Sequence, residues 1–116
     1  MTTTFADYSA AAEARKDIAA AVLGHTYALC EALRHGGPSG YDFYPETGRK
    51  YHKIIMVDSA GGRSVHAFVD KKTGEVYKSA SWKAPAKGVR YDLRIINQRE
   101  WLLENADWAG GYLYLR

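Results

Sequence analysis

At 116 residues the chain has the length of one domain, and its 47% apolar and 25% charged residues argue against a disordered or fibrous protein. One cysteine excludes an internal disulfide, no apolar run approaches the roughly 20 residues that cross a bilayer, and residues 1–8 lack a signal-peptide pattern. The formal charge of +3 is unevenly spread, because residues 50–96 hold ten Lys or Arg against four acids and the other residues hold six against nine. We therefore expect one cytoplasmic domain over residues 1–116, without membrane contact and with its positive charge concentrated in the second half.

A helical part is predicted over residues 1–36. Thr4 is a good capping residue, and Asp7 three positions on places negative charge in the first turn, where exposed N–H groups favour it. The following stretch is rich in alanine, and helical spacing relates Ile18, Val22, Leu29 and Leu33. Gly24 interrupts this pattern, which leaves open one helix or two with a kink or break. Cys30 lies on this stretch and is interpreted as a small buried apolar residue.

Three strands are predicted after a connecting segment. Residues 40–49 combine Gly, Pro and aromatic residues and indicate an ordered loop. Turn residues then separate three segments rich in β-branched and aromatic residues, at 51–58, 63–70 and 75–80. Gly74, at the end of the second turn, suits the left-handed position of a tight hairpin. These features predict a small antiparallel sheet.

The middle strand, 63–70, should have two unlike faces. Alternation places on the helix side Val65, Ala67 and Val69. It places on the other, partly open side Ser64, His66 and Phe68. If strands 51–58 and 63–70 pair around a turn centred on residues 60 and 61, His52 lies opposite Val69 and His66 opposite Ile55. The two histidines therefore need not meet.

The C-terminal part should add a helix and a last strand. A short extended piece is expected over 90–95, and Asn97 with Glu100 three residues later has the pattern of a capping box. This pattern predicts a short helix over 98–105. After two glycines, residues 112–115 are expected to form a closing strand. The predicted class is thus α+β, with a helical part at 1–36 packed on a sheet part at 50–116.

Signals for catalysis or metal binding are weak. The chain has no paired cysteines, no helical His pair around a Glu and no calcium-loop spacing, so no metal site and no cofactor are expected. The glycine pairs lack the lysine of a phosphate-binding loop. Ser64 with His66 is the only suggestion of a nucleophile and base, and it lacks a third orienting group. We therefore expect a protein that is not an enzyme, with no catalytic residue.

One basic loop, residues 78–94, interleaves cations with aromatic rings. Cations neutralise phosphates, and flat rings stack on bases, so the combination is typical of binding to nucleic acids or nucleotides. Pro85 limits the conformations of the loop, which lowers the entropy lost on binding. The predicted ligand-binding residues are Lys78, Trp82, Lys83, Lys87, Arg90 and Tyr91. The alternative is that the rings fill the core while the lysines are merely solvated.

The second half of the chain resembles a known family. Residues 64–93 read SVHAFVDKKTGEVYKSASWKAPAKGVRYDL and residues 106–116 read ADWAGGYLYLR. These runs resemble a family of small uncharacterised proteins of tailed bacteriophages. The resemblance implies a phage origin and action in the bacterial cytoplasm, and it transfers no catalytic residue.

Two functional hypotheses follow. The first is a non-enzymatic binder of a nucleic acid or nucleotide-like anion, acting through the basic loop. The second is a protein–protein inhibitor or modulator of a host enzyme, such as a defence enzyme, for which the phage resemblance and nine tyrosines speak. An alanine-rich helix can cover its own sheet or pair with a copy of itself, so a monomer and a homodimer both remain open.

Overall fold

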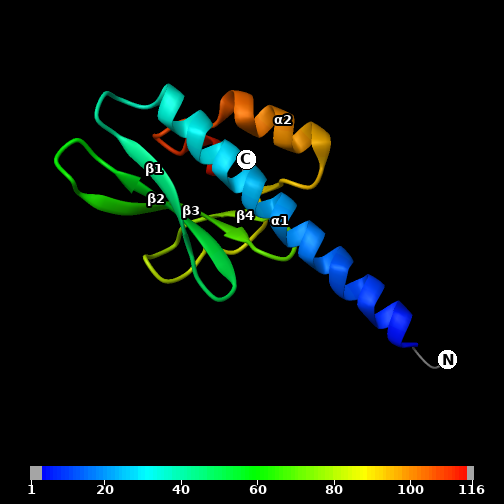
Figure 1. The fold of residues 1–116 in the computed structure, drawn as a ribbon. Coiled ribbons are helices and arrows are strands. Elements are labelled where there is room, and N and C mark those ends of the chain that lie inside the picture. Colours follow the sequence, from blue (N-terminus) through cyan, green and yellow to red (C-terminus); the bar gives the residue numbers. More distant parts are fainter. Residues whose placement is uncertain (1–3, 115–116) are drawn as a thin grey trace.

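The computed structural model describes residues 4–114 and confirms the α+β class. A long helix crosses a five-stranded antiparallel sheet, and a second helix lies beside the first (Figure 1). Within residues 4–114, no helix is long and apolar enough to span a membrane. The elements in chain order are α1 (Phe5–Gly36), β1 (Asp42–Thr47), β2 (Tyr51–Val57), β3 (Arg63–Asp70), β4 (Glu75–Lys78), β5 (Tyr91–Asp92), α2 (Ile96–Asn105) and the 3-10 helix η1 (Gly111–Leu113).

Helix α1 is one continuous helix, so the alternative of a break at Gly24 is wrong. Its first turn is closed by the predicted cap, in which the Thr4 hydroxyl accepts from the Asp7 N–H and the Asp7 carboxylate accepts from the Thr4 N–H. One glycine costs a helix only about 1 kcal/mol. The buried Val22 and Leu29 on either side of Gly24 pack into the core and offset this cost.

The sheet has the strand order β1-β2-β3-β4-β5, with every neighbouring pair antiparallel. The three predicted strands are confirmed as β2, β3 and β4, and Gly74 takes the expected left-handed φ of 78°. Residues 42–47, expected to be loop, form the edge strand β1 instead. An edge strand tolerates Pro45 because it has a side that needs no ladder hydrogen bond. The expected loop assignment is therefore wrong for these residues.

A β-bulge in β3 changes which side chains face the helix. The register pairs His52 with Val69, as predicted, but shifts by one residue between Ile54 and Ile55, so that His66 has no direct partner. The extra residue of a bulge reverses the alternation of side chains between the two parts of the strand that it separates. Val65 therefore pairs with Ile55 on the side away from α1, and His66 turns toward the core, where its ring lies 5.6 Å from that of Phe43. The expected faces of Val65 and His66 are wrong, and so is that of Ser64, which pairs with Met56 on the side of the core.

The C-terminal segment departs from the sequence prediction at three points. The extended piece expected over 90–95 is a strand only at Tyr91–Asp92 and is followed by a turn. Helix α2 begins at Ile96, not Gln98, because the Arg99 N–H already donates to the Ile95 carbonyl at 2.9 Å, and no side chain caps this end. Asn97 therefore lies inside the helix and is not the cap. In place of the expected closing strand the chain forms η1. Gly110, which precedes it, takes a φ of 79°, and the tight turn inserts Tyr112 into the core. Leu115 lies outside the described residues.

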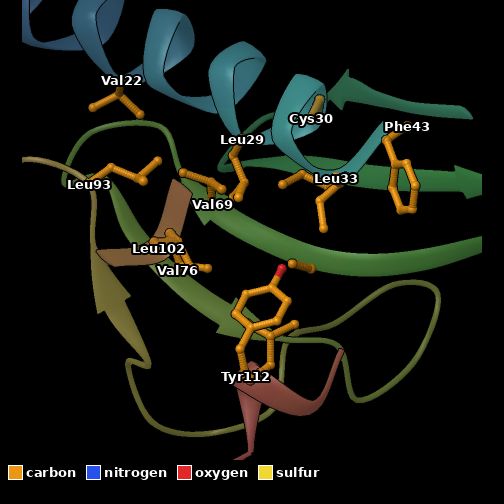
Figure 2. Packing of buried hydrophobic residues seen from close by; sticks show 13 residues of the cluster. Val22, Leu29, Cys30, Leu33, Phe43, Val69, Val76, Leu93, Leu102 and Tyr112 are labelled. Atoms are coloured by element: carbon orange, nitrogen blue, oxygen red, sulfur yellow. The ribbon is translucent and has the colours of Figure 1, made fainter. Parts of the chain in front are cut away.

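The buried core lies between the second half of α1, the near face of the sheet and the C-terminal segment (Figure 2). Burying a large apolar side chain stabilises a fold by about 1.5–3 kcal/mol. The core cluster is made of Val22, Leu29, Cys30, Leu33, Phe43, Ile54, Ala67, Val69, Val76, Leu93, Leu102, Tyr112 and Leu113. From Ala6 to Ala21 no side chain is buried, and this half of α1 projects from the body of a molecule that measures 56 × 27 × 25 Å (Figure 1).

Candidate functional site

The sheet face away from α1, called here the outer face, carries rings and cations. Its side chains follow from the register, in which Lys53 pairs with Phe68 and Phe68 with Tyr77. The residues next to these along the strands, such as Val69 and Val76, belong to the core. Because side chains alternate along a strand, Lys53, Phe68 and Tyr77 must point the other way.

The loop after β4 folds back over this face. The Ser79 hydroxyl donates to the Val65 carbonyl at 2.9 Å, and Ser79 also forms a β-bridge with Pro85. A tight turn between them is closed by hydrogen bonds from the Ala80 and Ser81 N–H groups to one carbonyl, that of Ala84. These contacts fix the position of the loop tip, which presents Trp82.

Trp82 is the predicted residue with the clearest binding geometry. Its ring centroid lies 5.2 Å from Lys53 Nζ and 5.5 Å from Arg63 Cζ, both on the outer face. Cations at such distances attract the ring face and hold the side chain in place. Trp82 nevertheless keeps 42% of its surface exposed. It is therefore an oriented aromatic side chain that a ligand can reach.

Further contacts extend this arrangement into a row. Lys53 Nζ also lies 5.9 Å from the ring of the buried Phe68, which in turn meets the Tyr51 ring edge-on at 5.6 Å. At one end Lys50 Nζ lies 5.3 Å from the Tyr51 ring, and at the other end Arg63 Cζ lies 5.9 Å from Tyr44. We call this set the aromatic–cationic row: Lys50, Tyr51, Phe68, Lys53, Trp82, Arg63 and Tyr44.

The positive charges of the row are only partly compensated by neighbouring groups. The Arg63 guanidinium donates to Glu46 Oε2 at 2.9 Å, and both side chains are about half exposed. An exposed ion pair of this kind is worth little, about 0–1 kcal/mol, so a phosphate can compete for Arg63. Lys50 and Lys53 are held beside rings. A ring compensates a cation less than a carboxylate does, so these ammonium groups remain able to attract anions.

The structure does not bring the six predicted residues into one patch. Lys78 pairs with Ala67 on the core side of the sheet, and its Nζ lies 4.8 Å from the Tyr114 ring. Lys83 follows Trp82 at the exposed loop tip, and Lys87 is exposed farther along the loop. Of these six described residues, Trp82 is the one whose ring lies beside cations of the outer face, Lys53 and Arg63.

Arg90 and Tyr91 are structural in this fold. Arg90 donates to the carbonyl of Leu113 and to two carbonyls of its own loop, so its N–H groups are directed at backbone acceptors. Tyr91 pairs with Val76 on the core side, stacks on Trp101 at 5.4 Å and donates its hydroxyl to the Tyr112 carbonyl. Tyr91 therefore lies on the side of the sheet opposite Trp82, and the Arg90 guanidinium is engaged by backbone carbonyls.

The ring of the buried His66 is likewise engaged in a contact within the core. Its Nε2 shares a hydrogen bond of 2.7 Å with the Tyr112 hydroxyl. Burial lowers the pKa of His66 to about 4, against the opposing effect of the Asp107 carboxylate. Burial likewise raises the pKa of the Tyr112 phenol. His66 is thus a neutral core group, which gives the Ser64–His66 idea no support.

Other reactive side chains in the described part of the chain form no recognisable centre. Burial raises the pKa of the Cys30 thiol to about 12, which makes it a poor nucleophile. Burial lowers the pKa of His25, beside Arg99, and of His52, near Lys71. Over residues 4–114, no three His, Cys, Asp or Glu side chains are grouped so as to hold a metal ion.

Fold and site together define a small α+β domain with a ring-bearing, cationic sheet face. The chain belongs to a family described as "Family of unknown function (DUF7717)", whose model matches residues 5–115. No curated protein and no solved structure matches the chain.

Proposed function

We propose that this domain is a non-enzymatic protein that binds single-stranded nucleic acid along the aromatic–cationic row. The observation that carries the proposal is the position of Trp82, half open to solvent beside Lys53 and Arg63. Proteins that hold single strands combine cations for the phosphates with rings on which bases stack. The row offers rings at Tyr51, Trp82 and Tyr44, each beside a cation, and several such positions suit a strand better than one nucleotide.

The proposal includes the setting in which such a protein would act. Resemblance of residues 64–93 to proteins of tailed bacteriophages supports a phage origin and the cytoplasm of the host bacterium as the place of action. Viral or host strands exposed during infection would be the ligands. The proposed site differs from the basic loop expected from the sequence. It keeps Trp82, with Lys83 beside it, from that loop and adds the cations and rings of the outer face of the sheet.

Replacing Trp82 by Ala should weaken binding about tenfold, because stacking of one base contributes about 1–3 kcal/mol. Fluorescence anisotropy with a labelled oligothymidylate of about 8 nucleotides measures this loss. Trp101→Ala is the matched control, since Trp101 has a similar exposure of 43% but stacks on Tyr91 on the other side. Equal affinities of the two variants, or equal binding of a mononucleotide, would contradict the proposal.

A second candidate function is the binding of a host protein, such as an enzyme that the domain would inhibit. Helix α2 favours it, because Ile96 is 59% exposed and Trp101 is 43% exposed on this helix. Exposed aromatic and large apolar side chains are enriched at protein interfaces.

Charge substitution on α2 separates the two functions. If a host protein is the partner, Ile96→Glu should abolish stoichiometric capture from bacterial lysate, whereas Trp82→Ala should leave it intact. Affinity for the oligonucleotide should fall in Trp82→Ala and stay unchanged in Ile96→Glu. Capture that persists in Ile96→Glu would remove α2 as the interface.

A further inference from the structure

A basic groove of about 980 Å³ lies between the projecting half of α1 and two turns of the sheet. The apolar residues of its lining are Ala12, Ile18 and Ala19, all from α1. Its lining also includes six cationic residues, namely Arg15, Lys16, Arg49, Lys50, Lys71 and Lys72. Clustered like charges concentrate counter-ions, so a groove with this lining attracts a polyanion.

The single carboxylate among the lining residues does little to cancel this charge. Asp70 is 8% exposed, and its Oδ1 accepts from the N–H groups of Lys72 and Thr73 in the β3–β4 turn. The carboxylate therefore serves the hairpin backbone. Lys71 Nζ donates to the Gly48 carbonyl at 3.1 Å, which ties this turn to the β1–β2 turn and holds the cations of both turns close together.

The groove is continuous with the aromatic–cationic row through Lys50. This residue lines the groove and also lies 5.3 Å from the Tyr51 ring, at the end of the row. A strand that leaves the outer face at Tyr51 thus meets the cations of the groove next. The groove has cations in place of rings, so it suits the phosphates of a strand more than its bases.

We infer that a strand bound on the outer face continues past Lys50 into this groove, whose cations form a phosphate-binding subsite. The inference rests on the proposed function, and it names the sugar–phosphate backbone as the occupant of the groove. The apolar residues of the lining offer contact for the sugars. Binding should consequently strengthen with the length of the strand until the groove is filled.

The test compares oligothymidylates of about 5 and about 15 nucleotides. The wild type should bind the longer one at least about tenfold more tightly, because more phosphates are neutralised. Arg15→Gln with Lys72→Gln should remove most of this gain and lower the slope of log affinity against log salt by about 1.4, at about 0.7 per phosphate contact. Binding of the shorter oligonucleotide should be unchanged.

A double variant that removes the same charge elsewhere is the control. Lys87→Gln with Arg94→Gln replaces two exposed cations that do not line the groove, and it should keep the full gain with length. All four replaced side chains are exposed, so circular dichroism should confirm an intact fold.

Failure of the groove as a subsite and failure of the proposed function would give different results. An equal loss in the control, or no loss in Arg15→Gln with Lys72→Gln, would overturn the groove while leaving Trp82-dependent binding of the shorter strand in place. Absence of binding to both oligonucleotides by the wild type would instead overturn the proposed function.

Discussion

Acidification from pH 7 to pH 4 should cost the protein about 3 kcal/mol of its free energy of unfolding through His66. In the unfolded chain this imidazole has its ordinary pKa of 6.5, whereas burial lowers the pKa to about 4 in the folded protein. Between these values the unfolded chain binds more protons, so acid favours unfolding. The stabilisation is fully present above pH 6.5 and is lost as the pH falls through about 4.

Urea unfolding of the wild type and of His66→Gln at both pH values measures this effect. Glutamine does not titrate and offers an amide to the Tyr112 hydroxyl. The difference in unfolding free energy between wild type and variant should therefore shrink by about 3 kcal/mol on acidification. His35→Gln, an exposed control on α1, should retain most of the wild-type loss. A difference between wild type and His66→Gln that is the same at both pH values would contradict the assignment.

Replacing Arg90 by Met should destabilise the fold by about 2 kcal/mol and leave binding by the folded molecules unchanged within about twofold. The guanidinium holds the Leu113 carbonyl and two carbonyls of the β4–β5 loop, at Lys87 and Gly88. Methionine keeps the apolar stem but leaves these acceptors without their charged donor. Chemical denaturation measures the loss, and anisotropy measures the affinity.

The control for Arg90 is a second cation of the same loop. Lys87→Met removes an exposed side chain and should change the unfolding free energy by no more than about 0.5 kcal/mol. If Arg90→Met were as stable as the wild type but bound nucleic acid more weakly, Arg90 would contact the ligand and the sequence-based site would regain support.

Much of the fold could be predicted from local signals. The Thr4 cap, the strands at 51–57 and 63–70, and the left-handed Gly74 all follow from residue preferences within a few positions. The bulge at His66 could not be predicted, because strict alternation along β3 looks equally regular without it. Its cause is tertiary, since it allows His66 to meet Phe43 and Tyr112 inside the core.

The candidate site was only partly predictable. Composition drew attention to Trp82, but it could not show that Tyr91 would lie on the opposite side of the sheet, because no repeating pattern fixes the path of the loop between them. Lys53 could have been found, since the predicted pairing of 51–58 with 63–70 already places it beside Phe68. Arg15 joins the groove through the packing of a helix against distant turns, which no local pattern encodes.

The long helix has two halves of unequal stability. Residues from Val22 on should open only when the core opens. The preceding turns have no fully buried side chain, pack on the core through the partly buried Ile18, and otherwise depend on alanine propensity and the Thr4 cap. Those turns should fray on the microsecond scale, and their amide protons should exchange with water long before those of Leu29. Because Arg15 and Lys16 belong to the fraying half, one wall of the groove is assembled intermittently. Part of the binding free energy of a ligand in the groove would be used to order these turns. Binding would therefore slow the exchange of their amide protons with water.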